Sequence, residues 1–399
     1  MSWIAIAARR RTDVGAVVAS MLLAVACAPA TPPQATSAPA PAATSAPQAT
    51  TAPAAAAQPT AAPQAAAPAG GKKGTIRVAF GLPLGNPSNP FAWIGKELGY
   101  FDEEGIDVEI ISTSGNNAQA DAMLLSNQID VGIFGLDPVL LPVASGKTIP
   151  ARAVFNVQNR SQYEGIVLED SPIKELTDLK GKKVAIPQLG GTLERYLAET
   201  LKSVNLSLDD IQFIATGIGV PMAEALKRGD ADVGFATRGQ IGPIELAGYK
   251  LHYLPRPAFA EQFITGNMVA RSDLSPDKEA ALKGYLRAYA KSIVFTKENP
   301  EAAIRISWKM YPDGKPKSVA DDKALADAIK VNTDYMAYID KQNGKWGYMP
   351  PDRLQYYAQY LGVADKIPDL TKYYTNDYID FANDFDEAKV REQARNWKP

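Results

Sequence analysis

Two short stretches, "IDVGIFG" at residues 129–135 and "DADVGFAT" at residues 230–237, share a pattern that decides the fold. Each places a valine and a glycine directly after an aspartate, continues with apolar residues and ends at a glycine or threonine. This is typical of a short buried strand that ends in a loop. Because the strand recurs much later in the chain, the sequence predicts that one unit of structure occurs twice.

The elements upstream of these two strands recur in the same order. The strand-like runs "IRVAF" (76–80) and "IDVEII" (106–111) correspond to "KKVAIP" (182–187) and "DIQFIAT" (210–216). The interval from Val78 to Val131 is close to that from Val184 to Val233. Helical patterns lie between the strands, as at 192–204, and also over 91–100, and this alternation is the α/β signature. We therefore expect two similar α/β lobes.

The rest of the chain predicts how the lobes are connected. After "QFITGNMVA" (262–270) the pattern is mostly helical. We expect a first part of lobe 1 over 74–160, lobe 2 over 161–260, and a return to lobe 1 with C-terminal helices over 261–399. The two crossings would form a hinge. Because open parallel sheets bind ligands at the carboxyl ends of their strands, two facing sheets define a binding cleft.

The N-terminal region has a different character. Three arginines (9–11) precede an apolar run over 14–26, which predicts a secretory signal peptide over 1–26. Cys27, the one cysteine in the chain, follows Ala24 and Ala26 and resembles the lipidated cysteine of bacterial lipoproteins. A free buried cysteine in an uncleaved helix is the alternative. Residues 28–71 contain no charged residue, so we expect 27–73 to be a lipidated cysteine followed by a disordered Ala/Pro-rich linker.

Composition limits the function classes. Lys and Arg total 42 against 44 Asp and Glu, so no basic excess points to nucleic acid. One cysteine and one histidine, His252, leave little for thiolate or imidazole metal sites. The motifs GxSxG, HExxH and GxxxxGK[ST] do not occur in the sequence. We therefore expect a protein that is not an enzyme and uses no cofactor and no metal.

The stretches "IGKELGYFDEEGIDVEII", "DVGIFG", "LKGKKVAIPQLGGTLERYLAETL" and "ALKRGDADVGFA" resemble the substrate-binding proteins of ABC importers. The resemblance is to the type II periplasmic branch that includes receptors for nitrate, sulfonates, taurine, the thiamine pyrimidine precursor and riboflavin. It implies a two-lobe fold that closes on its ligand by hinge motion. It also implies a monomer on the extracytoplasmic face of the cell membrane, with ABC permease and ATPase subunits as partners and a lipid anchor at Cys27.

Four strand-end loops and the hinge supply the candidate ligand-binding residues. Gly190 and Gly191 let the backbone approach a ligand closely, and a helix that begins at Thr192 offers free amides. The predicted set is Phe80, Asn89 and Trp93 in the first loop, Phe134, Gly135 and Asp137 in the second, Gln188, Gly190, Gly191 and Thr192 in the third, Phe235, Thr237 and Arg238 in the fourth, and Gln158, Asn159 and Asn267 near the hinge.

Aromatic and charged residues in this set favour different ligands. The aromatics indicate a planar heteroaromatic, vitamin-like molecule such as the thiamine pyrimidine precursor or riboflavin. Arg238 with Asp137 would instead suit a sulfonate or taurine-like zwitterion, and a nitrate receptor has the same fold. A tethered sensor subunit is a further alternative. So is a pyrimidine-synthase-like enzyme, although the cysteine and histidine chemistry that this enzyme implies is missing from the predicted loops.

Overall fold

The computed structural model describes residues 74–113, 117–317 and 319–399, which all belong to one compact unit. The predicted signal peptide, the candidate lipidation site Cys27 and the predicted linker lie outside the described residues. Within the described part, no helix combines the length and the apolar character that crossing a membrane requires.

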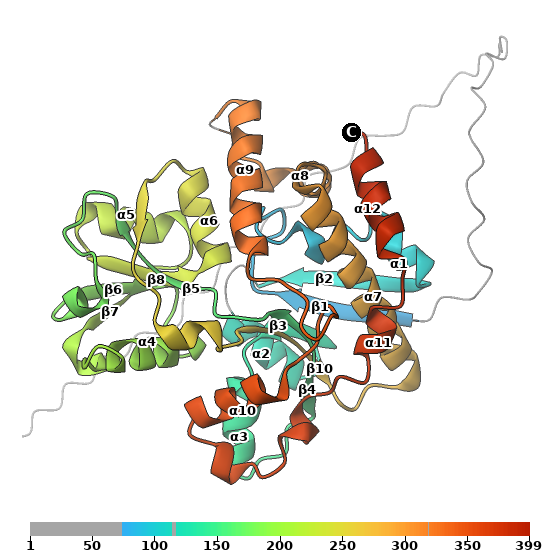
Figure 1. Cartoon of the computed structure of the whole chain (residues 1–399), viewed down its shortest axis with the longest axis horizontal. Helices are drawn as coiled ribbons and strands as arrows, with labels where there is room; N and C mark the ends of the chain where they lie inside the picture. Colours follow the sequence, from blue (N-terminus) through green and yellow to red (C-terminus); the bar gives the residue numbers. More distant parts are fainter. Residues whose placement is uncertain (1–73, 114–116, 318) are drawn as a thin grey trace, which may run out of the picture. The chain divides into compact units, whose positions relative to one another are not determined.

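The first sheet contains five strands in the order β2-β1-β3-β10-β4 (Figure 1). Their bounds are β1 (Gly74–Phe80), β2 (Ile106–Ser112), β3 (Val131–Phe134), β4 (Ala151–Gln158) and β10 (Gly266–Arg271). Strand β1 runs parallel to β2 and β3, whereas β10 runs antiparallel to both of its neighbours. The sheet is therefore completed by a strand that comes after the whole second sheet in the chain.

The second sheet repeats this arrangement with the order β7-β6-β8-β5-β9. Its strands are β5 (Tyr163–Leu168), β6 (Lys183–Ile186), β7 (Gln212–Ala215), β8 (Val233–Thr237) and β9 (Leu251–Tyr253). Strand β6 runs parallel to β7 and β8, and β5 runs antiparallel to β8 and β9. In each sheet the antiparallel strand occupies the fourth position, so the two sheets correspond strand by strand.

The register of the sheets agrees with the repeat seen in the sequence. Val78 lies opposite Val131 in the first sheet, and Val184 lies opposite Val233 in the second. These are the two valine pairs whose spacing indicated the duplication. The predicted α/β class with two similar lobes is confirmed.

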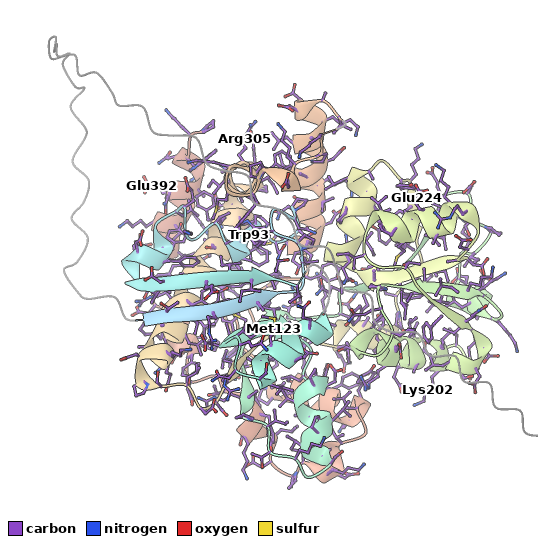
Figure 2. All side chains as sticks on the ribbon, turned by 180° about the vertical axis from the view of Figure 1, so that it is seen from behind. Trp93, Met123, Lys202, Glu224, Arg305 and Glu392 are labelled. Atoms are coloured by element: carbon purple, nitrogen blue, oxygen red, sulfur yellow. The ribbon has the colours of Figure 1, made fainter. Side chains whose placement is uncertain are left out.

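Helices cover both faces of each sheet. The helices associated with the first sheet are α2 (Asn117–Leu125) and α3 (Asp137–Ala144), and those of the second are α4 (Thr192–Lys202), α5 (Val220–Arg228) and α6 (Arg238–Leu246). Helices α4 and α5 lie on opposite sides of the second sheet, as the positions of Lys202 and Glu224 show (Figure 2). The C-terminal part contains α7 (Pro276–Glu298), α8 (Pro300–Met310), α9 (Asp321–Met336), α10 (Pro351–Tyr360), α11 (Ile379–Ala382) and α12 (Glu387–Asn396). Short 3₁₀ helices are η2 (Leu176–Leu179), η3 (Leu208–Asp210), η4 (Ala258–Glu261), η5 (Pro312–Gly314), η6 (Ala364–Lys366) and η7 (Leu370–Tyr373).

The core of the first sheet follows from strand alternation. Ile76 and Val78 point to the face covered by α7, where they join a cluster with Tyr285. Ala79 points to the other face, into a cluster that includes Leu140 of α3 and Tyr357 of α10. Each large apolar side chain buried in this way contributes roughly 1.5–3 kcal/mol. The C-terminal helices are therefore part of the core of the first lobe.

The expected helix over 91–100 does not form. The segment starts as the 3₁₀ helix η1 (Pro90–Ala92), continues as turns, and becomes helical only in α1 (Tyr100–Glu103). Gly99 takes a left-handed φ of 79°, which a continuous helix does not allow. Gly95 packs so closely on α7 that an added Cβ would lie 2.9 Å from Ser292 Oγ. The apolar spacing predicted correctly that the segment is buried, but Gly95 and Gly99 determine its backbone conformation.

Candidate ligand-binding site

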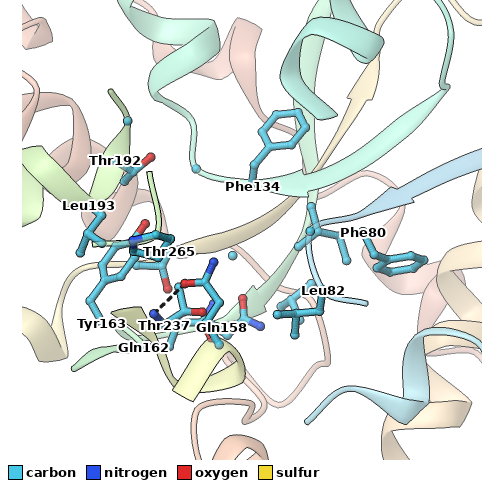
Figure 3. A pocket seen from close by; sticks show the side chains of 18 of the residues that line it. Phe80, Leu82, Phe134, Gln158, Gln162, Tyr163, Thr192, Leu193, Thr237 and Thr265 are labelled. Atoms are coloured by element: carbon cyan, nitrogen blue, oxygen red, sulfur yellow. Dashed lines mark hydrogen bonds between the residues drawn. The ribbon is translucent and has the colours of Figure 1, made fainter. Parts of the chain in front are cut away.

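A pocket with a cavity volume of about 130 Å³ lies between the two sheets and receives side chains from both lobes (Figure 3). Phe80 and Phe134 come from the ends of β1 and β3, and Thr192 and Thr237 come from the start of α4 and the end of β8. The loops after corresponding strands of the two sheets thus meet at one place. This is the arrangement expected of a ligand site in facing open sheets.

The pocket brings together eleven of the sixteen residues predicted from the sequence. The lining includes Gly190 and Gly191, just before α4. It also includes the amide side chains of Gln158 and Gln162, close to the segment where the chain crosses from the first lobe to the second. The eleven are Phe80, Asn89, Phe134, Gly135, Asp137, Gln158, Gln188, Gly190, Gly191, Thr192 and Thr237.

Two predicted aromatic residues lie behind the pocket wall. Trp93 is fully buried with its ring edge-to-face against Phe80 at 6.4 Å, and its Nε1 donates to Ser307 Oγ at 2.9 Å. Phe235 belongs to the core of the second lobe and packs over Gly165, where an added Cβ would lie 2.7 Å from its ring. Both rings support the site from behind because strand-end aromatics fill the space between sheet and helices.

Three predicted polar residues are engaged elsewhere. Arg238 Nη2 lies 2.7 Å from a carboxylate oxygen of Glu245 and 2.7 Å from one of Asp334. Asn159 Nδ2 donates to the carbonyl of Asp340 at 3.3 Å. Asn267 is fully buried and accepts a hydrogen bond from Asn156 at 3.0 Å. These side chains connect elements of the fold and do not line the cavity.

Asp137 lies in the first turn of α3 and makes its side-chain contacts outside its own helix. Leu136 is the N-cap of α3, and the Asp137 carboxylate instead accepts hydrogen bonds from Thr192 Oγ1 at 2.5 Å and Tyr357 Oη at 3.1 Å. Arg195 Nη1 lies 3.1 Å from its other oxygen. Thr192 and Arg195 belong to α4 and Tyr357 to α10. Asp137 therefore joins the first lobe, the second lobe and a C-terminal helix at the pocket.

Asp121 is a pocket residue that the sequence analysis missed. It lies on α2, and its Oδ1 is buried with no hydrogen-bond partner among the described residues. Burial, reinforced by the neighbouring charge of Asp137, raises the pKa of Asp121 to about 8. The rule that ligands bind at the carboxyl ends of strands points only to the loops after strands, whereas Asp121 lies one turn into helix α2. This helix follows β2, whose end was not among the four predicted loops, so an aspartate early in the helix after that strand was the available signal.

Amide side chains give the pocket further hydrogen-bond acceptors. The side-chain oxygens of Gln158, Gln162 and Asn89 are buried and have no partner in the described part of the chain. Gln158 reaches its position because residue 266 is glycine, where a Cβ would lie 1.3 Å from its Oε1. Figure 3 shows Gln158 and Gln162 among the side chains that line the pocket. Lysine and arginine are absent from the described residues that line it.

Aromatic walls close several sides of the pocket. Tyr163 of β5, Tyr289 of α7 and Tyr335 of α9 join the two predicted phenylalanines. The tyrosines of α7 and α9 were not predicted, because a helical pattern does not reveal which of its buried residues faces a distant loop. They make the C-terminal helices part of the pocket as well as of the core.

The single histidine of the chain lies away from the pocket. His252 is on β9, opposite Val167 of β5, and is not among the lining residues. Among the residues that the structure describes, no group of three or more His, Cys, Asp or Glu side chains is arranged to hold a metal ion. The described residues that line the cavity offer hydrogen-bonding, aromatic and charged groups.

The chain is similar in sequence to one described family and to several known proteins. Residues 86–303, more than half of the chain, match the family described as NMT1/THI5 like. A 4-amino-5-hydroxymethyl-2-methylpyrimidine phosphate synthase of Legionella pneumophila is 22% identical over 74% of this chain and 89% of its own length. A formylaminopyrimidine-binding protein of Halalkalibacterium halodurans is 21% identical over 55% of this chain. The chain spans 66% of the length of that protein and of a binding protein of Brucella abortus.

The fold is also found among solved structures. The aliphatic sulphonate-binding protein SsuA of Escherichia coli superposes with a TM-score of 0.54 at 18% identity, covering 82% of this chain and 92% of that protein. At this identity the likeness shows the fold alone, which is the type II periplasmic binding fold that the sequence resembles. With the family match over residues 86–303, the chain belongs to the NMT1/THI5-like family.

Proposed function

We propose that this protein is an extracytoplasmic solute-binding protein that holds one small nitrogen heteroaromatic molecule between its lobes and delivers it to an ABC importer. The observation that carries the proposal is the pocket whose walls come from both sheets, with Asp137 and Thr192 in contact across it. A ligand in such a pocket touches both lobes, so binding and lobe closure are coupled. A permease then recognises the closed, loaded form.

The size of the cavity favours a molecule with one ring. An apolar cavity of about 150 Å³ accommodates benzene, and the pocket here has a volume of about 130 Å³. The thiamine pyrimidine precursor has a single ring with small substituents, whereas riboflavin has three fused rings and a long side chain. We therefore favour the pyrimidine, which also agrees with the names of the Legionella and Halalkalibacterium relatives.

The charges around the cavity disfavour an anion. A sulfonate, taurine or nitrate receptor needs cationic or amide donors aimed at the ligand. The described lining carries the carboxyl groups of Asp121, Asp137 and Glu194 and no Lys or Arg side chain. Arg238, the cation proposed for a zwitterion, is already paired with two carboxylates. The acceptor-rich lining supports a ligand that donates hydrogen bonds.

The remaining parts of the proposal concern the membrane and the partners. The lipid anchor at Cys27, the linker that follows it and the permease and ATPase subunits complete an importer. A sensor subunit would present the same ligand to a signalling protein. The pyrimidine synthase of Legionella raises catalysis as the competing function. A synthase would convert bound material, whereas a receptor returns it unchanged.

The test is to identify what the protein binds and whether it changes it. The full chain is purified and denatured, and released small molecules are identified by mass spectrometry. Titration calorimetry with 4-amino-5-hydroxymethyl-2-methylpyrimidine, riboflavin and taurine follows, and each mixture is re-analysed for new products. Binding of the pyrimidine without conversion supports the proposal. Selective binding of taurine, or formation of product, contradicts it.

A matched pair of variants locates the binding. Leu193 in the first turn of α4 lines the pocket, whereas Leu189 in the loop before α4 is 61% exposed and does not. Leu193→Trp fills the cavity and is expected to abolish binding, and Leu189→Trp is expected to leave the dissociation constant within about threefold. Equal effects of the two variants would place the ligand elsewhere.

A further inference from the structure

The pocket contains one carboxyl group that nothing in the described structure satisfies. Asp121 Oδ1 is buried without a hydrogen-bond partner. Independently, Gln158 and Asn89, which are only 1% and 6% exposed, line the same cavity, and each carries a buried side-chain oxygen without a partner among the described residues. Unpaired buried acceptors cost free energy unless a ligand or an ordered water supplies donors. A ligand that carries N–H or O–H groups would satisfy these acceptors.

The other charged groups around Asp121 are already used. Asp137 accepts from Thr192 and Tyr357 and pairs with Arg195. Glu194 accepts a hydrogen bond from the backbone N–H of Gly190 at 2.5 Å. The hydroxyl of Tyr163 also faces this region, and burial raises its pKa above the ordinary value, so it stays protonated. Asp121 is left as the carboxyl group available to a ligand.

We infer that Asp121 reads a cyclic amidine edge, which is a ring nitrogen adjacent to an exocyclic amino group, through two parallel hydrogen bonds. This inference rests on the proposed function, because it assigns the chemical group that the pocket selects. The protonated carboxyl donates its O–H to the ring nitrogen, and its carbonyl oxygen accepts from the amino N–H. An aminopyrimidine has this edge, and taurine, nitrate and an unsubstituted pyrimidine lack it.

The protonation of Asp121 fits this pairing. Burial and the charge of Asp137 raise the pKa of Asp121 to about 8, so the carboxyl group carries its proton at neutral pH. Above that pKa the free protein has lost the proton that the complex needs, and binding must take one up. Affinity should then fall tenfold for each further pH unit. At pH values between the pKa of the ligand and about 8, affinity should not depend on pH through Asp121, because its carboxyl group keeps its proton there.

The experiment uses the full chain and two probes, 4-amino-5-hydroxymethyl-2-methylpyrimidine and the same compound without its amino group. Calorimetry at pH 7, 8, 9 and 10 is expected to show at least about tenfold tighter binding of the amino compound at pH 7. It should also show about a tenfold loss between pH 9 and pH 10. The compound without the amino group should bind more weakly at pH 7, and because its ring nitrogen still accepts the carboxyl proton, its affinity should also fall above about pH 8.

Two variants separate the hydrogen-bond pattern from the charge. Asp121→Asn retains one donor and one acceptor, so it should bind the amino compound within about threefold of the parent at pH 7 but without the decline at high pH. Asp121→Leu should lose at least about tenfold at every pH. Asp209→Leu, an exposed aspartate in the second lobe, controls for the substitution itself. Thermal unfolding of each variant verifies that it is folded.

The outcomes distinguish this inference from the function beneath it. If the parent protein binds both pyrimidines equally, or Asp121→Leu binds like the parent, the inference is wrong and the proposed function stands. If Asp121→Asn loses as much affinity as Asp121→Leu, the group recognised is a cation and not a neutral amidine edge, which also overturns the inference. If the parent binds neither pyrimidine and releases an unrelated solute on denaturation, both the inference and the pyrimidine proposal fail.

Discussion

The hydroxyl of Thr192 donates a hydrogen bond to Asp137 Oδ1 at 2.5 Å, and this bond joins the first turn of α4 to the first turn of α3 across the pocket. Arg195 reinforces it from the next turn of α4, at 3.1 Å from the other carboxylate oxygen. Lobe closure therefore has a direct protein contribution beside whatever the ligand adds. Because Asp137 also lines the cavity, the contact and the ligand occupy neighbouring positions.

Thr192→Val tests this contact, since it removes the hydroxyl group and keeps the shape of the side chain. A hydrogen bond to a charged group contributes about 1.5–3 kcal/mol, so ligand affinity should fall by roughly tenfold or more as closure becomes less favourable. Calorimetry measures the affinity and small-angle scattering measures the closure. Thr200→Val is the control, because Thr200 bonds within α4 to the carbonyl of Tyr196. Equal affinities for the two variants would show that the contact does not assist closure.

Gly135→Ala tests the same contact by crowding it. A Cβ at residue 135 would lie 2.6 Å from Asp137 Oδ1, 2.7 Å from Tyr357 Oη and 2.9 Å from Thr192 Oγ1. The variant should fold but bind its solute at least about tenfold more weakly, because overpacking costs about 1–3 kcal/mol. Gly191→Ala is the comparison variant, since no protein atom lies within 4 Å of its added Cβ, so a loss of affinity there reports direct contact with the ligand. An unchanged affinity of Gly135→Ala would contradict this account of the crowding.

Arg238→Met is expected to affect stability more than binding. The side chain of Arg238 is 5% exposed and pairs with Glu245 of α6 and Asp334 of α9, so its removal leaves Glu245 without its cation, while Asp334 keeps Lys330 at 2.6 Å. Loss of one partner from a largely buried pair costs on the order of 3 kcal/mol. The midpoint of thermal unfolding should fall while the dissociation constant changes by less than about threefold. Arg228→Met, in an exposed pair with Asp230, should leave the midpoint nearly unchanged. A large loss of affinity at an unchanged midpoint would return Arg238 to the binding site.

Asp130→Asn is expected to change the acid sensitivity of the fold. Burial alone would raise the pKa of Asp130, but hydrogen bonds from Arg77 and Lys278 outweigh it and lower the pKa below its usual value. The stabilisation is therefore fully present above the unfolded value, near 4, and is lost as the pH falls through the folded value. The variant should be less stable at pH 7 and show a shallower decline below pH 4 in chemical unfolding. Asp209→Asn should keep the decline of the parent, and a variant curve parallel to that of the parent would refute the assignment.

The duplicated α/β architecture was predictable because it depends on strand patterns that the sequence repeats. Val78, Val131, Val184 and Val233 are core positions of parallel strands, and such positions are restricted to apolar side chains. The strand-end rule also placed Phe134, Thr192 and Thr237 at the pocket, since the loops after parallel strands lie at one edge of a sheet. These successes rest on geometry that is local in the sequence.

The remainder depends on packing that local patterns do not encode. Thr237 is the last residue of β8 and Arg238 comes directly after it. The long side chain of Arg238 nevertheless reaches Glu245 and Asp334 instead of the cavity. Tyr335 lines the pocket from a helix far along the chain. Gly99 interrupted a segment whose apolar spacing was helical. Side-chain reach, distant helices and backbone freedom therefore account for the differences.

The position of β10 between β3 and β4 has a consequence for biosynthesis. A ribosome delivers every strand of the second sheet before residues 266–271, so that sheet is able to form while the first still lacks its fourth strand. Until then β4 has no neighbour that connects it to β3, and its edge is exposed to pairing with other chains. In this order β10 inserts between two strands that already exist, before the C-terminal helices complete the core, and a chaperone that shields β4 until then would protect the nascent chain from aggregation.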